Sequence, residues 1–322
     1  MTTSNFRSKL YAKSVVETPH AEQNPAESVY GFAEQLVQSM KALGRDRTAE
    51  TYAVTLNSFK RFCRMDDLSF DQIDSDLIEA YEAYLKRIGA QPNTTSFYMR
   101  NLRAIYNRAV EKDLVVQANP FRHVYTGVDK TVKRAITLAD IRRIKELDLT
   151  VNPAQALSRD IFLFSFYTRG MAFVDIAHLK KRDLRGGVLS YRRRKTGQQL
   201  FIKWEKCMQD IVDKYKSAGS PYLLPLIDHN VGDERPQYLS MSHKINRHLK
   251  RIGQQAGISI PLTMYVARHA WASIARSRNI PLSIISEGMG HENERTTRIY
   301  LASLESSVVD DANSTLLKAL ME

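Results

Sequence analysis

The chain has little cysteine: Cys63 and Cys207 are its only two among 322 residues, and they lie far apart. Two thiols exclude a disulfide framework and a zinc finger, and both residues are expected to be buried thiols in a reducing cytoplasm. No apolar run approaches the roughly 20 residues of a membrane span. The first residues lack the apolar core of a secretory signal. No H-x-x-x-H or C-x-x-C spacing marks a metal site, so we expect neither a metal nor a cofactor.

Basic residues are in excess. The chain has 47 Lys and Arg against 35 Asp and Glu, which gives a formal net charge of +12. This balance predicts a polyanionic partner, with nucleic acid as the first choice and an anionic membrane surface as the second. The length allows two domains, and a hydrophobic content of 43% predicts that most of the chain folds.

Residues 28–125 have the helical periodicity of a small bundle. They follow a polar segment, 1–24, which we expect to be an arm that is flexible when unbound. Apolar residues recur three or four positions apart in four successive stretches, each of which predicts an amphipathic helix. The clearest members are Phe32, Leu36, Met40, Tyr52, Leu56, Phe59, Leu77, Tyr81, Leu85, Leu102, Ile105 and Tyr106. Four such helices predict a bundle of roughly a hundred residues.

Basic residues lie on and after the fourth of these helices. Three arginines occupy its side opposite the apolar residues, where they form either an ordinary solvated face or a contact with a DNA backbone. They are Arg100, Arg103 and Arg108. The net charge favours the DNA contact. Asn119-Pro120 ends the bundle, and residues 126–135 predict a basic linker whose Lys133 and Arg134 can follow a phosphate backbone.

A second domain, 136–305, mixes helices with a β-hairpin. Thr137 and Asp140 have the spacing of a helix-start box, and the apolar run 161–167 predicts a buried helix. Alternating segments flank Lys195-Thr196-Gly197 and predict the hairpin. Three arginines give its turn a basic end suited to DNA, namely Arg192, Arg193 and Arg194. Strands are expected at 188–191 and 199–204, helices near 205–218, 242–256, 263–278 and 281–288, and an amphipathic tail at 306–322.

The last third of the chain contains residues suited to phosphodiester chemistry. Arg268-His269, Gly290-His291 and Tyr300 occur in that order inside helix-like segments. A phenol can form a covalent phosphoester, an arginine matches two phosphate oxygens, and an imidazole can move a proton near neutral pH. Each residue alone also has an ordinary explanation: a packed aromatic for Tyr300, a surface ion pair for Arg268 and a helix cap for His291.

The segments TMYVARHAWASIA and EGMGHENERTTRIYLA resemble the second half of the catalytic domain of the tyrosine recombinases, the phage integrase family. The family pattern is H-x-x-R-H, then L-G-H, then a tyrosine in a T-T-x-x-Y setting. The matching residues here are Tyr265, Arg268, His269, Gly290, His291, Thr296, Thr297 and Tyr300, together with Lys195 in K-T-G. The resemblance covers most of the chain. It implies a helical, SAM-like core-binding domain followed by a mixed α+β catalytic domain, in a mainly α fold with a small β-sheet.

The resemblance also implies residue roles. Tyr300 attacks the scissile phosphate and leaves a 3′-phosphotyrosyl link with a free 5′-hydroxyl, so that religation needs no ATP. Arg268 binds the non-bridging oxygens, where charge grows in the transition state. His291 donates to a phosphate oxygen, and Lys195 protonates the leaving 5′-oxygen. His269 is interpreted as a buried, hydrogen-bonded histidine that braces the site.

The chain departs from the family at the first arginine of the pattern. Ala172 stands where that arginine belongs, and Arg169 lies three positions earlier. Because three residues are nearly one helical turn, our hypothesis is that Arg169 is the displaced first arginine. The alternative is that Arg169 caps the buried helix before it. Asp175 corresponds to the acidic residue of the family, which braces an arginine.

A second departure places Tyr265 where the pattern has histidine. A phenol can donate a hydrogen bond to phosphate, but it cannot act as an imidazole base at neutral pH. The acceptor of the Tyr300 proton therefore stays open between His291, the phosphate itself and water.

These features predict a site-specific DNA recombinase that acts as a homo-tetramer on two duplex sites with inverted-repeat cores. The tail, 306–322, either packs into an adjacent protomer or folds back onto its own domain. A DNA-binding regulator or architectural protein without chemistry is the main alternative, supported by Ala172. A type IB topoisomerase is a third. Among recombinases, the two departures resemble Bacteroides-type integrases and invertases, which serve mobile elements or invert a DNA segment.

Overall fold

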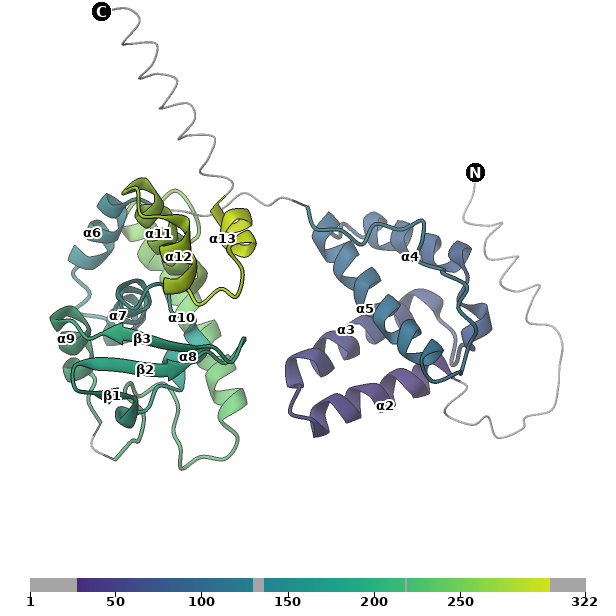
Figure 1. The fold of residues 1–322 in the computed structure, drawn as a ribbon, viewed down its shortest axis with the longest axis horizontal. Helices are drawn as coiled ribbons and strands as arrows, with labels where there is room; N and C mark the ends of the chain where they lie inside the picture. Colours follow the sequence, from purple (N-terminus) through teal and green to yellow (C-terminus); the bar gives the residue numbers. More distant parts are fainter. Residues whose placement is uncertain (1–27, 130–135, 218, 302–322) are drawn as a thin grey trace, which may run out of the picture. The chain divides into compact units, whose positions relative to one another are not determined.

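The computed structural model describes residues 28–129, 136–217 and 219–301, and the chain divides into two compact units, 1–131 and 132–322. Figure 1 shows the elements of both units. The predicted arm, the predicted tail, Lys133 and Arg134 lie outside the described residues. Each unit has its own apolar core.

The first unit is helical. Its elements are α2 (Val29–Ala42), α3 (Asp46–Cys63), the 3-10 turn η1 (Phe70–Gln72), α4 (Ser75–Arg87) and α5 (Pro92–Val110). The apolar stripe of each α-helix faces one shared core, in which Phe59 packs edge-on against Tyr81. The residues at two helix starts explain why the helices begin there. The Asp74 side chain caps α4, and Pro92 is the first residue of α5. The four predicted amphipathic helices are confirmed.

The first unit continues past the predicted end of the bundle. Phe121 and Val124, beyond Pro120, are buried in its core. The segment predicted as a linker also begins in contact with α5, since the Asp129 N–H donates to the Asn93 side chain at 2.8 Å and the Asn93 amide donates back to the Asp129 carbonyl at 3.1 Å. These are polar contacts between side chain and backbone, which hydrophobic periodicity does not reveal.

Most helices of the second unit pack around one buried helix, α7 (Pro153–Tyr167). Its helices are α6 (Leu138–Glu146), α7 (Pro153–Tyr167), α8 (Phe173–Ala177), α9 (Lys206–Lys214), α10 (Glu234–Gln255), α11 (Met264–Ser277), α12 (Leu282–Gly288) and α13 (Glu294–Leu301), with the 3-10 turn η2 (Lys181–Asp183). Ile161, Phe162 and Phe164 of α7 are fully buried, as predicted, and α6, α9, α10 and α11 pack around this helix. The predicted start box is present, with Thr137 and Asp140 capping reciprocally.

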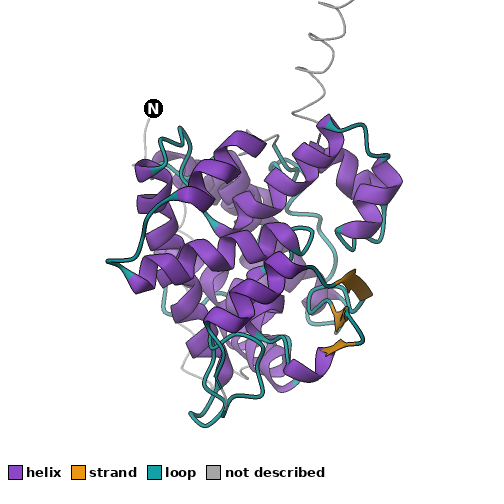
Figure 2. Cartoon of the chain, turned by 90° about the vertical axis from the view of Figure 1, so that its left-hand side faces the viewer, coloured by secondary structure: helices purple, strands orange, loops and turns teal. Residues whose placement is uncertain are grey.

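A small antiparallel sheet completes this unit, with the strand order β1 (Leu184–Arg185), β2 (Val188–Arg192) and β3 (Gln199–Lys203). The hairpin β2–β3 was predicted, whereas β1 was not, because two residues are too few to show alternation. Figure 2 shows how far helices outnumber strands. The mainly α fold with a small sheet is confirmed.

Three helices near the C-terminal end of the unit pack together. α11, α12 and α13 contact one another (Figure 1) around a small cluster containing Ala272, Ile285, Met289 and Leu301. This packing brings the Arg268 helix, the His291 turn and the Tyr300 helix to one place. No helix among the described residues is both long and apolar enough to cross a membrane.

Candidate active site

Arg268 lies in α11 and is 8% exposed. Its Nη1 donates to the Gly170 carbonyl at 2.8 Å, and its Nη2 donates to the Met289 carbonyl at 2.6 Å. Gly170 follows α7 with φ 73°, and a Cβ atom there would lie 2.7 Å from the Arg268 Cα. Only glycine fits this backbone approach. The guanidinium is therefore held in place by carbonyls from two loops before any ligand binds.

Arg169 ends α7 in a left-handed conformation, with φ 62°. Its N–H donates to the Phe166 carbonyl, and the Gly170 N–H donates to the Ser165 carbonyl, which together make a Schellman motif. A non-glycine residue in this conformation costs about 1–2 kcal/mol. Its half-buried side chain runs toward α12, because a Cβ at Gly288 would lie 3.6 Å from the Arg169 Cδ. The backbone of Arg169 therefore caps α7, as the alternative interpretation expected, while its side chain extends toward α12.

Arg193 occupies a different environment from its neighbours in the hairpin. Arg192 and Arg194 are exposed, whereas Arg193 is 8% exposed, and its Nη1 donates to the Gly290 carbonyl at 2.5 Å. Arg193 and Arg268 therefore bind the successive carbonyls of Gly290 and Met289 at the C-terminal end of α12, where the helix dipole favours cations. Arg193 was predicted to contact DNA together with Arg192 and Arg194. Strand alternation distinguishes it from these neighbours, because Leu189, Tyr191 and Arg193 are all buried.

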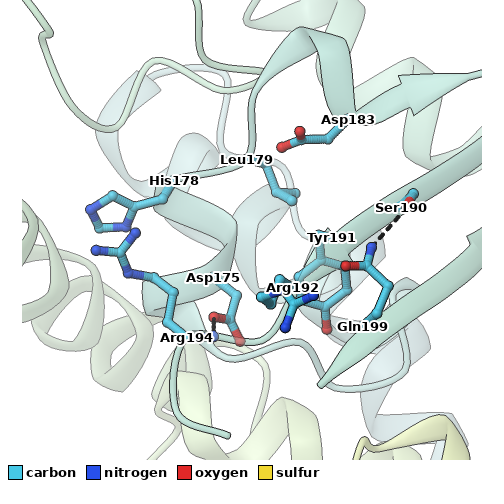
Figure 3. A pocket seen from close by; sticks show the side chains of 9 residues that line it. All are labelled: Asp175, His178, Leu179, Asp183, Ser190, Tyr191, Arg192, Arg194 and Gln199. Atoms are coloured by element: carbon cyan, nitrogen blue, oxygen red, sulfur yellow. Dashed lines mark hydrogen bonds between the residues drawn. The ribbon is translucent and has the colours of Figure 1, made fainter. Parts of the chain in front are cut away.

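Asp175 is buried in α8, and its carboxylate accepts the Arg194 backbone N–H at 2.9 Å (Figure 3). Burial raises the pKa of Asp175, while the Arg194 N–H and the charges of Arg193 and Arg268 act to lower it. The Asp175 carboxylate therefore binds the backbone of the hairpin directly before Lys195. The Arg194 side chain extends away toward His178, on the wall of a cavity of about 310 Å³.

His291 follows Gly290 and completes the cluster. The Arg268 Nη2 donates to its Nε2 at 3.1 Å, and its Nδ1 lies 2.7 Å from the Thr297 hydroxyl. Burial, together with the charges of Arg268, Arg193 and Lys195, lowers the pKa of His291 to about 4. The imidazole is therefore neutral near pH 7, and its Nε2 faces the arginines as a hydrogen-bond acceptor.

The remaining predicted residues lie around this cluster. Lys195 is exposed in the hairpin turn, close enough for its charge to act on His291. Tyr265 is 56% exposed on the first turn of α11, and its ring meets the buried His269 ring edge-on at 4.3 Å. Tyr300 belongs to α13, three residues after Thr297, and its side chain lies outside the described atoms.

A basic surface on α10 was not predicted. Four cations on its solvent side are exposed and form no ion pair within the described residues, namely Lys244, Arg247, Lys250 and Arg251. We call them the α10 stripe. Their spacing of three to four residues along one helix face could have revealed them. Asn246, beside the stripe, accepts the Met264 N–H at 2.9 Å, which connects this part of α10 to the start of α11.

The predicted arginines of the first unit differ in their contacts. Arg100 is exposed, Arg108 is half-buried, and Arg103 donates to the Thr126 hydroxyl at 3.2 Å. Arg103 therefore also ties the start of the predicted linker to α5. Across the described parts of both units, no group of three or more His, Cys, Asp or Glu is arranged to hold a metal ion.

Comparison with known families agrees with this arrangement. Residues 28–126 match the phage integrase SAM-like domain, and residues 134–307 match the phage integrase family. The chain belongs to the phage integrase family. Its helical first unit and the second unit that holds the arginine cluster are the two parts these descriptions cover.

Curated relatives share most of its length. The tyrosine recombinase XerA of Thermococcus kodakarensis is 25% identical over 268 residues, covering 70% of this chain and 90% of XerA. The tyrosine recombinase XerD of Listeria innocua is 22% identical over 246 residues, covering 71% of this chain and 78% of XerD.

Solved structures share the fold. The XerH site-specific recombinase, bound to a palindromic difH substrate in a post-cleavage complex, gives a TM-score of 0.67 at 14% identity, covering 93% of this chain and 99% of XerH. The lambda integrase tetramer bound to a Holliday junction gives 0.65 at 16% identity, covering 92% and 85%.

Proposed function

We propose that the protein is a site-specific DNA recombinase that cuts and rejoins strands through a tyrosine ester. The observation that carries this proposal is the convergence of two buried arginines and a neutral histidine beside α13, the helix that contains Tyr300. A phosphodiester carries one negative charge and gains more in the transition state, so two largely buried guanidiniums fixed by backbone carbonyls can stabilise it. Membership of the phage integrase family supports the same reaction.

The reaction balances with residues of this chain. The Tyr300 oxygen attacks phosphorus, the bond to the 5′-oxygen breaks, and that oxygen takes a proton from Lys195. The Tyr300 phenol must lose its own proton, because its ordinary pKa is about 10. His291 is the acceptor that we favour, since its Nε2 carries a lone pair at neutral pH. Religation reverses these steps. A free 5′-hydroxyl of another strand attacks the phosphotyrosine and gives its proton to Lys195, and the Tyr300 oxygen takes its proton back from His291.

Arg268 and Arg193 are proposed to bind the non-bridging oxygens. Arg268 has the position of the family arginine, and Arg193 enters from the hairpin, held by the Gly290 carbonyl. Arg193 thus compensates for Ala172, and Arg169 remains a second candidate because its side chain also leads toward α12. Tyr265 is proposed as a donor to phosphate at the exposed edge, and His269 as its support.

DNA is proposed to bind along the exposed cations. These are the α10 stripe, the hairpin turn and the basic side of α5, with Lys133 and Arg134 between the two proposed domains, 28–125 and 136–305. We further propose inverted-repeat core sites and a homo-tetramer whose tails, 306–322, pass between protomers. The lambda integrase tetramer on a Holliday junction supports the tetrameric state. A DNA substrate also agrees with the cytoplasmic location expected from the sequence.

The decisive experiment uses a nicked duplex that contains an inverted repeat mapped beside the gene, so that the released 5′-fragment diffuses away. The wild-type protein should accumulate a covalent protein–DNA adduct. Tyr300→Phe should bind the same duplex with unchanged affinity and give no adduct. Binding without an adduct in the wild-type protein would instead favour the regulator or architectural alternative, which Ala172 supports.

A further inference from the structure

Thr297 and Thr296 are adjacent in α13, but their side chains have opposite surroundings. Thr296 is exposed, whereas Thr297 is fully buried, and its hydroxyl lies 2.7 Å from the His291 Nδ1. The proposed strand-transfer steps give Thr297 no role. A buried hydroxyl bonded to a site histidine is a polar contact that apolar packing alone does not require.

The contacts of His291 determine which ring nitrogen carries the proton. Arginine has no hydrogen-bond acceptor, so the Arg268 contact requires a lone pair on Nε2. A neutral imidazole then has its single proton on Nδ1, and Nδ1–H donates to the Thr297 hydroxyl. The partner of one ring nitrogen commonly sets the state of the other in this way.

We propose that Thr297 is a positioning residue whose hydroxyl holds His291 as the Nδ1–H tautomer, with Nε2 turned toward Arg268 as the proton acceptor. This inference rests on the proposed strand-transfer function. When phosphate takes the Arg268 N–H, Nε2 is released to receive the phenol proton. The resulting imidazolium keeps its Nδ1–H bond to Thr297 and presents a new Nε2–H to the phosphate.

The same bond connects the histidine to the helix of the nucleophile. His291 is held at its backbone by a bond from its N–H to the Ser286 carbonyl of α12, at 3.0 Å. Thr297 lies one turn before Tyr300 in α13. The Thr297 hydroxyl therefore joins the acceptor to the element that delivers the phenol. Loss of the Thr297 hydroxyl therefore affects both the tautomer of His291 and the position of α13 relative to His291.

Three variants of the full chain separate this role from packing. Thr297→Val keeps the side-chain shape and removes the hydroxyl, Thr297→Ser keeps the hydroxyl, and Thr296→Val makes the same change at the exposed neighbour. The His291 tautomer is measured without DNA, by NMR of the ¹⁵N-histidine-labelled protein, with His291→Gln used for assignment. The rate of adduct formation is measured on the nicked duplex over a pH range that extends down to about 4, the pKa of His291, in the same buffers.

We expect the Nδ1–H tautomer in the wild-type, Thr297→Ser and Thr296→Val proteins, and a mixture or the Nε2–H form in Thr297→Val. Cleavage by Thr297→Val should fall about 10- to 100-fold, the range typical when the hydrogen-bond partner of a metal-bound histidine is removed, because such a bond also fixes a histidine tautomer. Its pH profile should also shift, because the groups facing His291, namely Arg268, Arg193 and Lys195, then act on a different tautomer. Thr297→Ser should stay within about threefold of the wild-type rate.

Three outcomes overturn the inference: an Nε2–H tautomer in the wild-type protein, a wild-type rate and pH profile in Thr297→Val, or equal defects in Thr297→Ser and Thr297→Val. The first of these needs no Thr297 variant and no DNA, so it stands even if Thr297→Val does not fold. If the recombinase proposal is wrong, the wild-type protein forms no covalent adduct with DNA. The tautomer of His291 can still be measured in that case, so the two failures are distinguishable.

Discussion

The arginines at the candidate site and those of the α10 stripe have the same side chain in opposite surroundings. Arg193 and Arg268 are buried and bound to backbone carbonyls, whereas Arg247 and Arg251 are exposed and have no ion-pair partner within the described residues. The first pair has lost its rotamer freedom on folding, and the second keeps it until a ligand binds. Buried arginines should therefore affect the rate of chemistry, and exposed ones the affinity for DNA.

Arg268→Ala is expected to have the largest effect. Loss of a donor directed at a developing oxyanion costs roughly 10²- to 10³-fold in rate. Adduct formation on the nicked duplex should fall by that amount at saturating protein. Arg278→Ala, an exposed arginine just beyond α11, serves as the control. If Arg268→Ala lowered only the affinity for DNA, Arg268 would act like an arginine of the α10 stripe. That result would contradict the expected difference between buried and exposed arginines.

Arg193→Ala and Arg169→Ala together test which arginine compensates for Ala172. We expect Arg193→Ala to slow cleavage about 100-fold, and Arg169→Ala to have a clearly smaller effect. Arg193→Lys should not restore the rate, because an ammonium lacks the planar fork that can contact a carbonyl and a phosphate together. The reverse ranking in single-turnover assays would restore Arg169 as the displaced first arginine.

Substitutions in the α10 stripe should weaken binding without changing the chemical step. Each phosphate that a variant no longer neutralises should make the slope of log K against log salt shallower by about 0.9. Arg247→Ala and Lys250→Ala can be measured by fluorescence anisotropy between 50 and 200 mM salt, about the range over which such slopes are resolved. Unchanged slopes would remove the stripe from the DNA-binding surface.

A further expected effect is on stability. His291 has a folded-state pKa of about 4, below its unfolded value of about 6.5, so the unfolded chain binds the proton first as the pH falls. Its contribution to stability is therefore complete above about pH 6.5 and is lost as the pH falls toward 4. Chemical unfolding of the wild-type protein and His291→Gln at several pH values should show a difference that narrows on acidification. A constant difference would contradict the lowered pKa.

The sequence predicted much of this molecule because its strongest patterns are local. The buried run of α7, the K-T-G hairpin and the spaced pattern around Arg268 and His291 each depend on residues close together in the chain. Arg193 was grouped with its two exposed neighbours because three consecutive arginines look alike in a sequence. Only the continuation of the strand alternation past β2 separates the buried one from its neighbours.

Other features depend on contacts that a linear pattern does not contain. α10 begins at Glu234, well before the predicted residue 242, because Asp233 caps it and Pro236 is tolerated in the first turn. The packing of residues 126–129 on α5 uses hydrogen bonds rather than apolar spacing. The His291 tautomer follows from two partners, one of them more than twenty positions away in α11.

The carbonyls of Met289 and Gly290 belong to the main chain, so the residues of α12 can change identity without removing what holds the two guanidiniums. Gly290 is the exception. Its φ is 64°, and an added Cβ would come within 2.9 Å of Leu200 and 3.4 Å of Arg193. Exposed residues of α12 can therefore change while both carbonyls stay in place, whereas an alanine at position 290 would strain the backbone and push the β2–β3 hairpin away from the arginine cluster.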